Sequence, residues 1–171
     1  WIELPVPEGT PRVLEGARGR SPSQNENSSV LASRIMAENQ KIVLYIEDNL
    51  SNLRLIDRVL ANRPGIKVVS ALRGATGLQL AKQTPPDLIL LDLNLPDMHG
   101  SDVLQALQQS PETASCPVVV ISADATAAQI ERLLTSGARS YLTKPIDVKE
   151  FLVTVDTILR EQPGALNRRA A

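Results

Sequence analysis

Aromatic side chains and an excess of charge of one sign are both lacking in this chain of 171 residues. It has one tryptophan, two tyrosines and one phenylalanine, so a nucleic-acid surface built on base stacking is not expected. The 18 lysines and arginines are balanced by 19 aspartates and glutamates, which leaves no basic excess to neutralise a row of phosphates. These two absences argue against a nucleic-acid partner.

Cysteine, histidine and long apolar runs are scarce too. The single cysteine, Cys116, cannot form a disulfide within the chain, which favours a reducing, cytoplasmic setting. No apolar run reaches the roughly 18 residues of a membrane-spanning helix, so direct membrane contact is not expected. The single histidine, His99, lies in a turn flanked by proline and glycine, where an exposed turn residue is a simpler interpretation than a phosphate donor.

Apolar runs alternate with helical periodicity between residues 41 and 160, in a chain of which 43% is hydrophobic. The predicted strands are 41–46, 66–70, 87–91, 117–121 and 140–143. The predicted helices lie around Leu53, Ile56 and Leu60 and at 74–83, 101–109, 125–136 and 147–160. The strands are apolar throughout, which indicates a parallel sheet with helices on both faces. The predicted fold is therefore α/β, a doubly wound sheet of five parallel strands.

Chemically related side chains follow these strands at their carboxyl ends, where ligands bind in sheets of this kind. Glu47 and Asp48 follow the first strand, Asp92 the third, Ser122 the fourth and Lys144 the fifth. Three carboxylates at one edge repel one another unless a cation joins them. All candidate ligands are oxygen donors, so the hard ion Mg²⁺, or Mn²⁺, is expected rather than Zn²⁺. A carboxylate beside this ion, a lysine and a hydroxyl can attack phosphorus and form an aspartyl phosphate.

Each of these residues also has an ordinary structural interpretation. Glu47 and Asp48 could form only a polar turn that starts a helix. Asp92 could belong to the turn chemistry of the segment that follows it. Ser122 could cap a helix, and Lys144 could be a solvated surface charge. Each alternative is plausible singly, but such residues at successive strand ends favour a common site.

Four segments together resemble a known family. They are Glu47-Asp48, Asp87-Leu-Ile-Leu-Leu-Asp-Leu-Asn-Leu-Pro-Asp-Met-His-Gly100, Val118-Val-Val-Ile-Ser-Ala123 and Tyr141-Leu-Thr-Lys-Pro145. The intervals are 44 residues from Asp48 to Asp92, 30 from there to Ser122 and 22 more to Lys144. On these motifs, residues 41–160 resemble a CheY-like receiver domain of two-component signalling. The resemblance implies a flavodoxin-like (βα)5 fold with strand order 2-1-3-4-5.

The resemblance also implies roles for the residues at the strand ends. Asp92 would accept a phosphoryl group. Mg²⁺ would be held by Asp48, Asp92 and the backbone carbonyl of Asn94, with Glu47 assisting through water. Lys144 would pair with the phosphoryl oxygens, and its peptide bond to the following proline is cis in the family.

Two further residues would form a switch in such a domain. Ser122 would donate its hydroxyl to the phosphoryl group, while Tyr141 would change between outward and inward rotamers. The signal would then leave through the surface made by the predicted helix 125–136, strand 140–143 and helix 147–160.

The resemblance predicts a phosphoryl-accepting receiver of a phosphorelay rather than an enzyme with substrates of its own. Its donor would be the phosphohistidine of a sensor histidine kinase. The phosphoryl group would pass to a histidine phosphotransfer protein or be lost to water. A monomer or weak dimer is expected, without an output domain after the receiver.

The ends of the chain carry separate expectations. Residues 1–40 are predicted to hold a remnant strand and a flexible linker, and residues 161–171 a disordered tail. The remnant, Trp1–Pro5, resembles the closing strand of a histidine kinase ATP-binding domain, and the chain lacks a starting methionine. We therefore expect the C-terminal receiver of a hybrid histidine kinase, with a stand-alone regulator as the alternative.

Three other functions compete with this one. A Mg²⁺-dependent phosphohydrolase with Asp92 as nucleophile generally needs a second carboxylate two residues on, where this chain has Asn94. A flavodoxin-like cofactor binder needs a loop that attracts phosphate, but the first strand–helix loop is acidic. A pseudo-receiver that serves only as an interaction module is disfavoured, because no site residue of the family pattern is missing.

Overall fold

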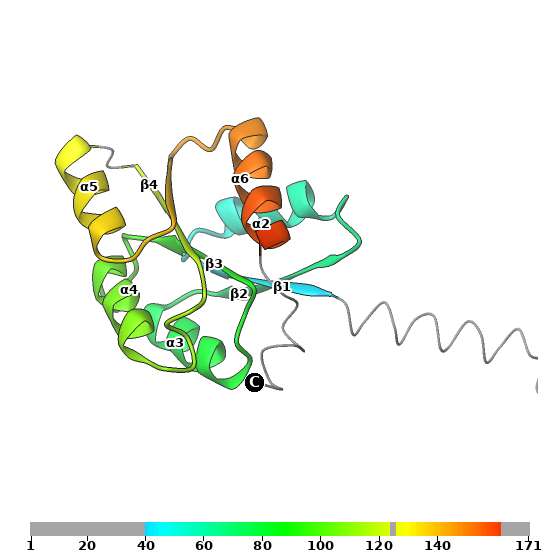
Figure 1. Ribbon diagram of the computed structural model, residues 1–171. Helices are drawn as coiled ribbons and strands as arrows, with labels where there is room; N and C mark the ends of the chain where they lie inside the picture. Colours follow the sequence, from blue (N-terminus) through cyan, green and yellow to red (C-terminus); the bar gives the residue numbers. More distant parts are fainter. Residues whose placement is uncertain (1–39, 124–125, 162–171) are drawn as a thin grey trace, which may run out of the picture. The chain divides into compact units, whose positions relative to one another are not determined.

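The computed structural model describes residues 40–123 and 126–161, which form a sheet with helices on both sides (Figure 1). The elements in chain order are β1 (Lys41–Ile46), α2 (Leu50–Leu60), β2 (Ile66–Ala71), α3 (Gly74–Gln83), β3 (Leu88–Asp92), α4 (Gly100–Gln109), β4 (Val118–Ser122), α5 (Ala127–Thr135), β5 (Ser140–Thr143) and α6 (Val148–Glu161). The predicted remnant strand, linker and tail lie outside the described residues, except for positions 40 and 161.

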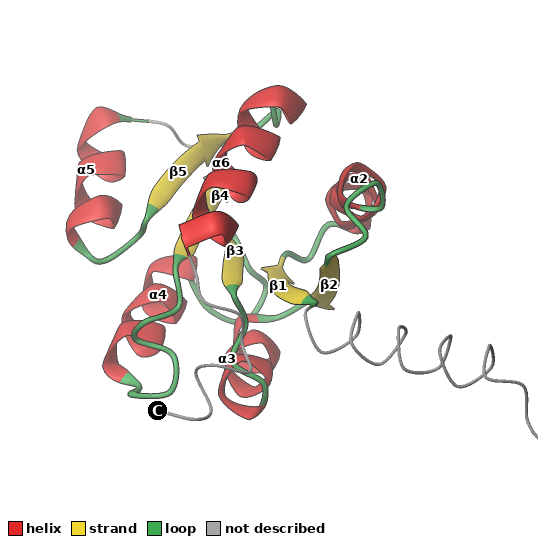
Figure 2. Ribbon diagram, turned by 45° about the vertical axis from the view of Figure 1, so that its right-hand side comes forward, coloured by secondary structure: helices red, strands yellow, loops and turns green. Residues whose placement is uncertain are grey.

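The sheet has five strands in the order β2-β1-β3-β4-β5, and every neighbouring pair is parallel. Each strand is joined to the next by a helix, so the chain crosses over between strands in the manner of a doubly wound fold. Figure 2 shows the helices on the two sides of the strands. The predicted α/β class and strand order 2-1-3-4-5 are confirmed.

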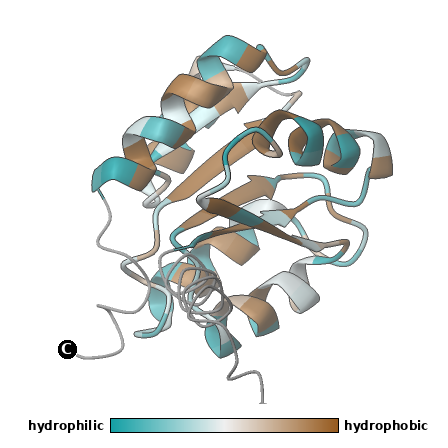
Figure 3. Ribbon diagram, turned by 90° about the vertical axis from the view of Figure 1, so that its right-hand side faces the viewer, coloured by the Kyte–Doolittle hydropathy of each residue, from teal (hydrophilic) through white to brown (hydrophobic). Residues whose placement is uncertain are grey.

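The strands are apolar throughout because both faces of the sheet are covered. In β1, Leu44 and Ile46 belong to the core cluster under α3 and α4, whereas Val43 and Tyr45 belong to the cluster under α2 and α6. The strands are accordingly mostly hydrophobic, whereas the helices around them mix hydrophobic and hydrophilic residues (Figure 3). Among the described residues, no helix combines the length and the apolar character needed to cross a membrane.

Three strands, β2, β3 and β4, end one residue later than predicted, and in β3 and β4 the extra residue is polar. Asp92 continues the ladder of β3 by pairing with Ile121, and Ser122 continues that of β4 by pairing with Thr143. The pairing extends because backbone hydrogen bonding does not depend on side-chain polarity. As a result, the carboxylate of Asp92 and the hydroxyl of Ser122 are attached to ordered sheet backbone instead of to loops.

Candidate functional site

Three carboxylates meet at the carboxyl ends of β1 and β3. Glu47 and Asp48 follow β1 directly, and Asp92 is the last residue of β3, the strand beside it. One carboxylate oxygen from each of the three lies within 4.8 Å of the others. Glu47 and Asp92 are buried, with 1% and 4% of their surface exposed, whereas Asp48 is exposed. The site therefore consists of two buried acids and one that faces solvent.

Lys144, just beyond β5, provides the cation that these acids need. Its Nζ lies 2.8 Å from Oε2 of Glu47 and 3.1 Å from Oδ2 of Asp92, so a single ammonium is shared by two buried carboxylates. The backbone N–H of Lys144 donates to the carbonyl of Ser122, which ties the residue to the end of β4. The Lys144–Pro145 peptide bond is cis, as the resemblance implied.

Burial and the neighbouring charges together shift the pKa values of two groups of the site. Burial raises the pKa of Asp92, and the negative charge of Glu47 raises it further, while Lys144 offsets only part of the increase. Burial by itself would lower the pKa of Lys144, but its bonds to Glu47 and Asp92 outweigh this and raise it. A further positive charge would therefore be stabilised beside Asp92.

Glu47 is held by three donors, and neither Tyr45 nor the N–H of Asn49 was identified from the sequence. The hydroxyl of Tyr45 donates to Oε2 at 2.7 Å, beside Lys144, and the backbone N–H of Asn49 donates to Oε1 at 3.2 Å. Tyr45 is fully buried, and burial followed by the bond to Glu47 raises its pKa, so it remains a neutral donor. The sequence does contain one signal for this contact: Tyr45 is two residues before Glu47, and residues two apart in a strand share a face.

The loop after β3 is held against the site by a close approach of backbone to backbone. The N–H of Gly100 donates to the carbonyl of Leu93 at 2.8 Å, and Asn94 forms an isolated bridge with His99. A Cβ on Gly100 would collide with the carbonyl oxygen of Asp92 and lie 2.7 Å from Cα of Leu93. Glycine is required here because no side chain fits between the two segments. This packing fixes the loop that contains Asn94.

A second attachment holds the same loop from the side of α3. Both carboxylate oxygens of Asp97 accept backbone N–H groups at the start of that helix, from Gly74 at 2.9 Å and from Ala75 at 3.0 Å. These bonds hold the pKa of Asp97 below its ordinary range. Asp97 is 23 and 22 residues from Gly74 and Ala75, so this cap leaves no local pattern in the sequence.

The two predicted switch residues lie at neighbouring strands. Ser122 is fully buried at the end of β4, and Tyr141 lies half-buried in β5, packed against the core cluster under α3 and α4. The alternative that Ser122 caps a helix is wrong, since α5 begins at Ala127 and its cap is Thr126. The alternative that Lys144 is a solvated surface charge is wrong too, because it is paired with buried acids.

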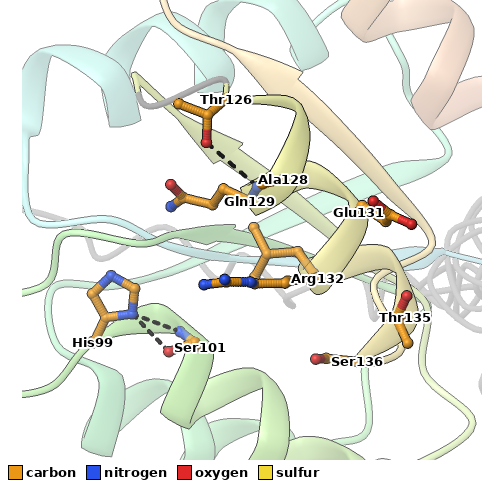
Figure 4. A pocket seen from close by; sticks show the side chains of 10 residues that line it. His99, Ser101, Thr126, Ala128, Gln129, Glu131, Arg132, Thr135 and Ser136 are labelled. Atoms are coloured by element: carbon orange, nitrogen blue, oxygen red, sulfur yellow. Dashed lines mark hydrogen bonds between the residues drawn. The ribbon is translucent and has the colours of Figure 1, made fainter.

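His99 lies outside the acidic site. It is exposed, as expected for a turn residue, but it also caps α4: its Nδ1 accepts the N–H of Ser101 at 3.2 Å. With Ser101 it borders a groove of about 800 Å³, whose other side is formed by α5, including Arg132 (Figure 4). None of the three carboxylates lines this groove, so it is separate from the acidic site.

A parallel α/β sheet with an acidic cluster at the carboxyl ends of two inner strands, and a lysine after an edge strand that pairs with that cluster, defines a class of phosphate-handling signalling domain. The response regulator receiver domain profile matches residues 43–156 of this sequence. The chain belongs to this family, whose members receive phosphoryl groups from histidine kinases in two-component signalling.

Individual relatives agree with this assignment. The polar-differentiation response regulator DivK of Brucella anthropi is 34% identical over 119 residues, which cover 70% of this chain and 96% of DivK. The receiver domain of the Francisella response regulator 1452 is 25% identical, with a TM-score of 0.66 over 71% of this chain and 98% of that one.

A third relative shares the fold. It is the receiver domain of a Pseudomonas aeruginosa sensor histidine kinase, which is 24% identical, with a TM-score of 0.64 over 70% of this chain and 98% of that domain. That structure has a magnesium ion coordinated in its active-site cleft.

Proposed function

We propose that Asp92 is the residue that accepts the phosphoryl group, from the phosphohistidine of a sensor histidine kinase. The observation that carries the proposal is the position of its carboxylate, at the end of a central strand and 3.1 Å from the ammonium of Lys144. Asp92 has 4% of its surface exposed, so it is desolvated yet reaches the edge of the sheet. A desolvated carboxylate next to a fixed cation is suited to attack on phosphorus.

Mg²⁺ fits this site on the chemistry of its donors. The three carboxylates offer oxygen ligands within 4.8 Å of one another, and the negative charge of Glu47 adds to the increase that burial causes in the pKa of Asp92. We assign Asp48, Asp92 and the backbone carbonyl of Asn94 as ligands, with Glu47 assisting through water. When bound, the ion would offset the repulsion and withdraw charge from the phosphoryl oxygens.

The transfer step follows from these positions. An oxygen of Asp92 forms a bond to phosphorus while the bond between phosphorus and the donor imidazole nitrogen breaks. The electron pair stays on that nitrogen, which then takes up a proton. Lys144 moves its donation from the carboxylate of Asp92 to an oxygen of the phosphoryl group. Its positive charge then lies beside the negative charge of the phosphoryl oxygens.

The state of the site would be communicated through its neighbours in the sheet. Ser122 would donate its hydroxyl to the phosphoryl group, and Tyr141 would change its rotamer in response. The surface formed by α5, β5 and α6 would present the change to a partner. The phosphoryl group itself would pass to a histidine phosphotransfer protein or to water, in the cytoplasm, with the protein a monomer or weak dimer.

Intact-mass measurement after incubation with acetyl phosphate and Mg²⁺ tests the assignment. The unaltered protein should gain one phosphoryl group, and Asp92→Asn should gain none. Asp102→Asn is the matched control, because Asp102 is exposed in the first turn of α4 and outside the acidic cluster. Equal labelling of Asp92→Asn and the unaltered protein would overturn the proposal.

The same preparation tests the competing phosphohydrolase function. An enzyme of that class would release phosphate from a small ester such as p-nitrophenyl phosphate over many turnovers. We expect a single phosphorylation without sustained turnover, because the residue two positions after Asp92 is Asn94, whose amide cannot serve as a general acid.

A further inference from the structure

Tyr45 is chemically unusual among its neighbours in the core. The hydrophobic-cluster residues around it on β1, β3 and β4 are aliphatic, namely Val43, Leu88, Leu90, Val119 and Ile121, and the polar residues on this face, Lys41 and Asp92, stand at strand ends. A phenol hydroxyl in such surroundings is costly unless it forms a hydrogen bond. The hydroxyl of Tyr45 forms it with a single carboxylate of the site, 2.7 Å away, and not with the backbone. Packing alone therefore does not account for tyrosine at this position.

The carboxylate that Tyr45 holds depends on a cation that has another partner. Glu47 has 1% of its surface exposed, so bulk solvent has little access to it in place of a lost donor. Its Oε2 accepts from Tyr45 and from Lys144, but Lys144 is also 3.1 Å from Asp92. In the proposed function Lys144 turns toward the phosphoryl group. Tyr45, fixed in the core, is the side-chain donor that stays with Glu47.

We propose that Tyr45 is a positioning residue, which orients the carboxylate of Glu47 toward the metal position and keeps it there when Lys144 turns to the phosphoryl group. This inference rests on the proposed function of the site. Glu47 has three side-chain torsions, so without the phenol its orientation would depend on Lys144 and on the N–H of Asn49. Loss of such an outer partner typically weakens metal affinity by about 10-fold to 100-fold.

The test is the Mg²⁺ affinity of the unphosphorylated protein, measured by isothermal titration calorimetry. Tyr45→Phe keeps the ring and removes only the hydroxyl, and it should bind Mg²⁺ about 10-fold more weakly. Ile56→Val is the matched control, because Ile56 is fully buried in the same core cluster but is not among the donors to Glu47. It should lower thermal stability and leave Mg²⁺ affinity unchanged. Equal affinities of Tyr45→Phe and the unaltered protein would overturn the inference.

A double-mutant cycle with Glu47→Gln separates positioning from a general effect on the core. If Tyr45 acts through the carboxylate, Tyr45→Phe should change Mg²⁺ affinity little once Glu47 has been replaced. Full additivity of the two changes would overturn the inference. Tyr45→Leu, with a side chain of the neighbouring type, repeats the cycle should the phenylalanine variant fold poorly.

Phosphorylation by acetyl phosphate distinguishes this inference from the proposed function. Labelling of Tyr45→Phe should be slow at low Mg²⁺ and approach that of the unaltered protein at saturating Mg²⁺. If the unaltered protein is not labelled on Asp92 at all, the proposed function fails. If it is labelled and Tyr45→Phe shows the same Mg²⁺ dependence, only the role of Tyr45 fails.

Discussion

Replacement of Lys144 by methionine would leave two buried carboxylates without their shared cation. The ammonium is 2.8 Å from Glu47 and 3.1 Å from Asp92, and the side chains of these acids are 1% and 5% exposed. Removing one partner of a buried ion pair costs about 3–5 kcal/mol. The side chain of Lys144 is itself 20% exposed, so solvent screens part of this interaction. We therefore expect Lys144→Met to lose about 2–4 kcal/mol of unfolding free energy at pH 7.

The pH dependence of this loss has a definite sign. Burial and Glu47 raise the pKa of Asp92 above its value in the unfolded chain, so its ionised form destabilises the native state at neutral pH. This destabilisation is relieved as the pH falls through the native pKa, and Lys144→Met enlarges it. The stability deficit of Lys144→Met should therefore shrink between pH 7 and pH 5.

Urea unfolding in the presence of a chelator, at both pH values, measures the effect of Lys144→Met. Lys149→Met, an exposed lysine in the first turn of α6, is the matched control and should change stability by less than about 1 kcal/mol. A deficit equal to that of the control, or one that grows toward pH 5, would refute the electrostatic reasoning.

Two further predictions concern the loop after β3. Gly100→Ala should cost about 1–3 kcal/mol of unfolding free energy and weaken Mg²⁺ binding, because the added methyl collides with the backbone of Asp92. Urea unfolding measures the first effect and calorimetry the second. Unchanged stability and Mg²⁺ affinity would refute the close approach. Asp97→Asn should lower the melting temperature at pH 6, because the carboxylate that binds Gly74 and Ala75 is lost. Since folding lowers the pKa of Asp97, its contribution is complete above the unfolded value of about 3.9 and is lost as the pH falls through the lower native pKa. Thermal melts at pH 6 and pH 3 should therefore show a difference that narrows at the lower pH, and a constant difference would contradict the cap.

The sheet could be predicted from the sequence because burial on both faces makes each strand a continuous apolar run. The carboxyl ends of parallel strands lie at the same edge of a sheet. The grouping of Glu47, Asp48, Asp92 and Lys144 could therefore also be predicted from the sequence. The exact end of β3 could not be predicted, because Asp92 is polar yet still paired in the ladder.

The contacts that hold the site in place were harder to predict. Tyr45 counts as a core residue in any pattern of hydrophobicity, and only its hydroxyl bond to Glu47 connects it to the site. Asp97 acts on a helix 22 and 23 residues away in sequence, beyond the reach of local capping rules. Such bonds depend on the tertiary arrangement, which sequence periodicity does not encode.

The loop after β3 is attached at two points, so one side of the acidic site is held in place. Asp97 fastens the loop to α3, and the contact of Gly100 with the backbone of Asp92 leaves no free space beside it. A group attached to Asp92 would therefore find no room on that side. In the proposed function, the effect of a phosphoryl group on Asp92 would therefore be directed toward the other side of the site, where Ser122 and Tyr141 lie in β4 and β5.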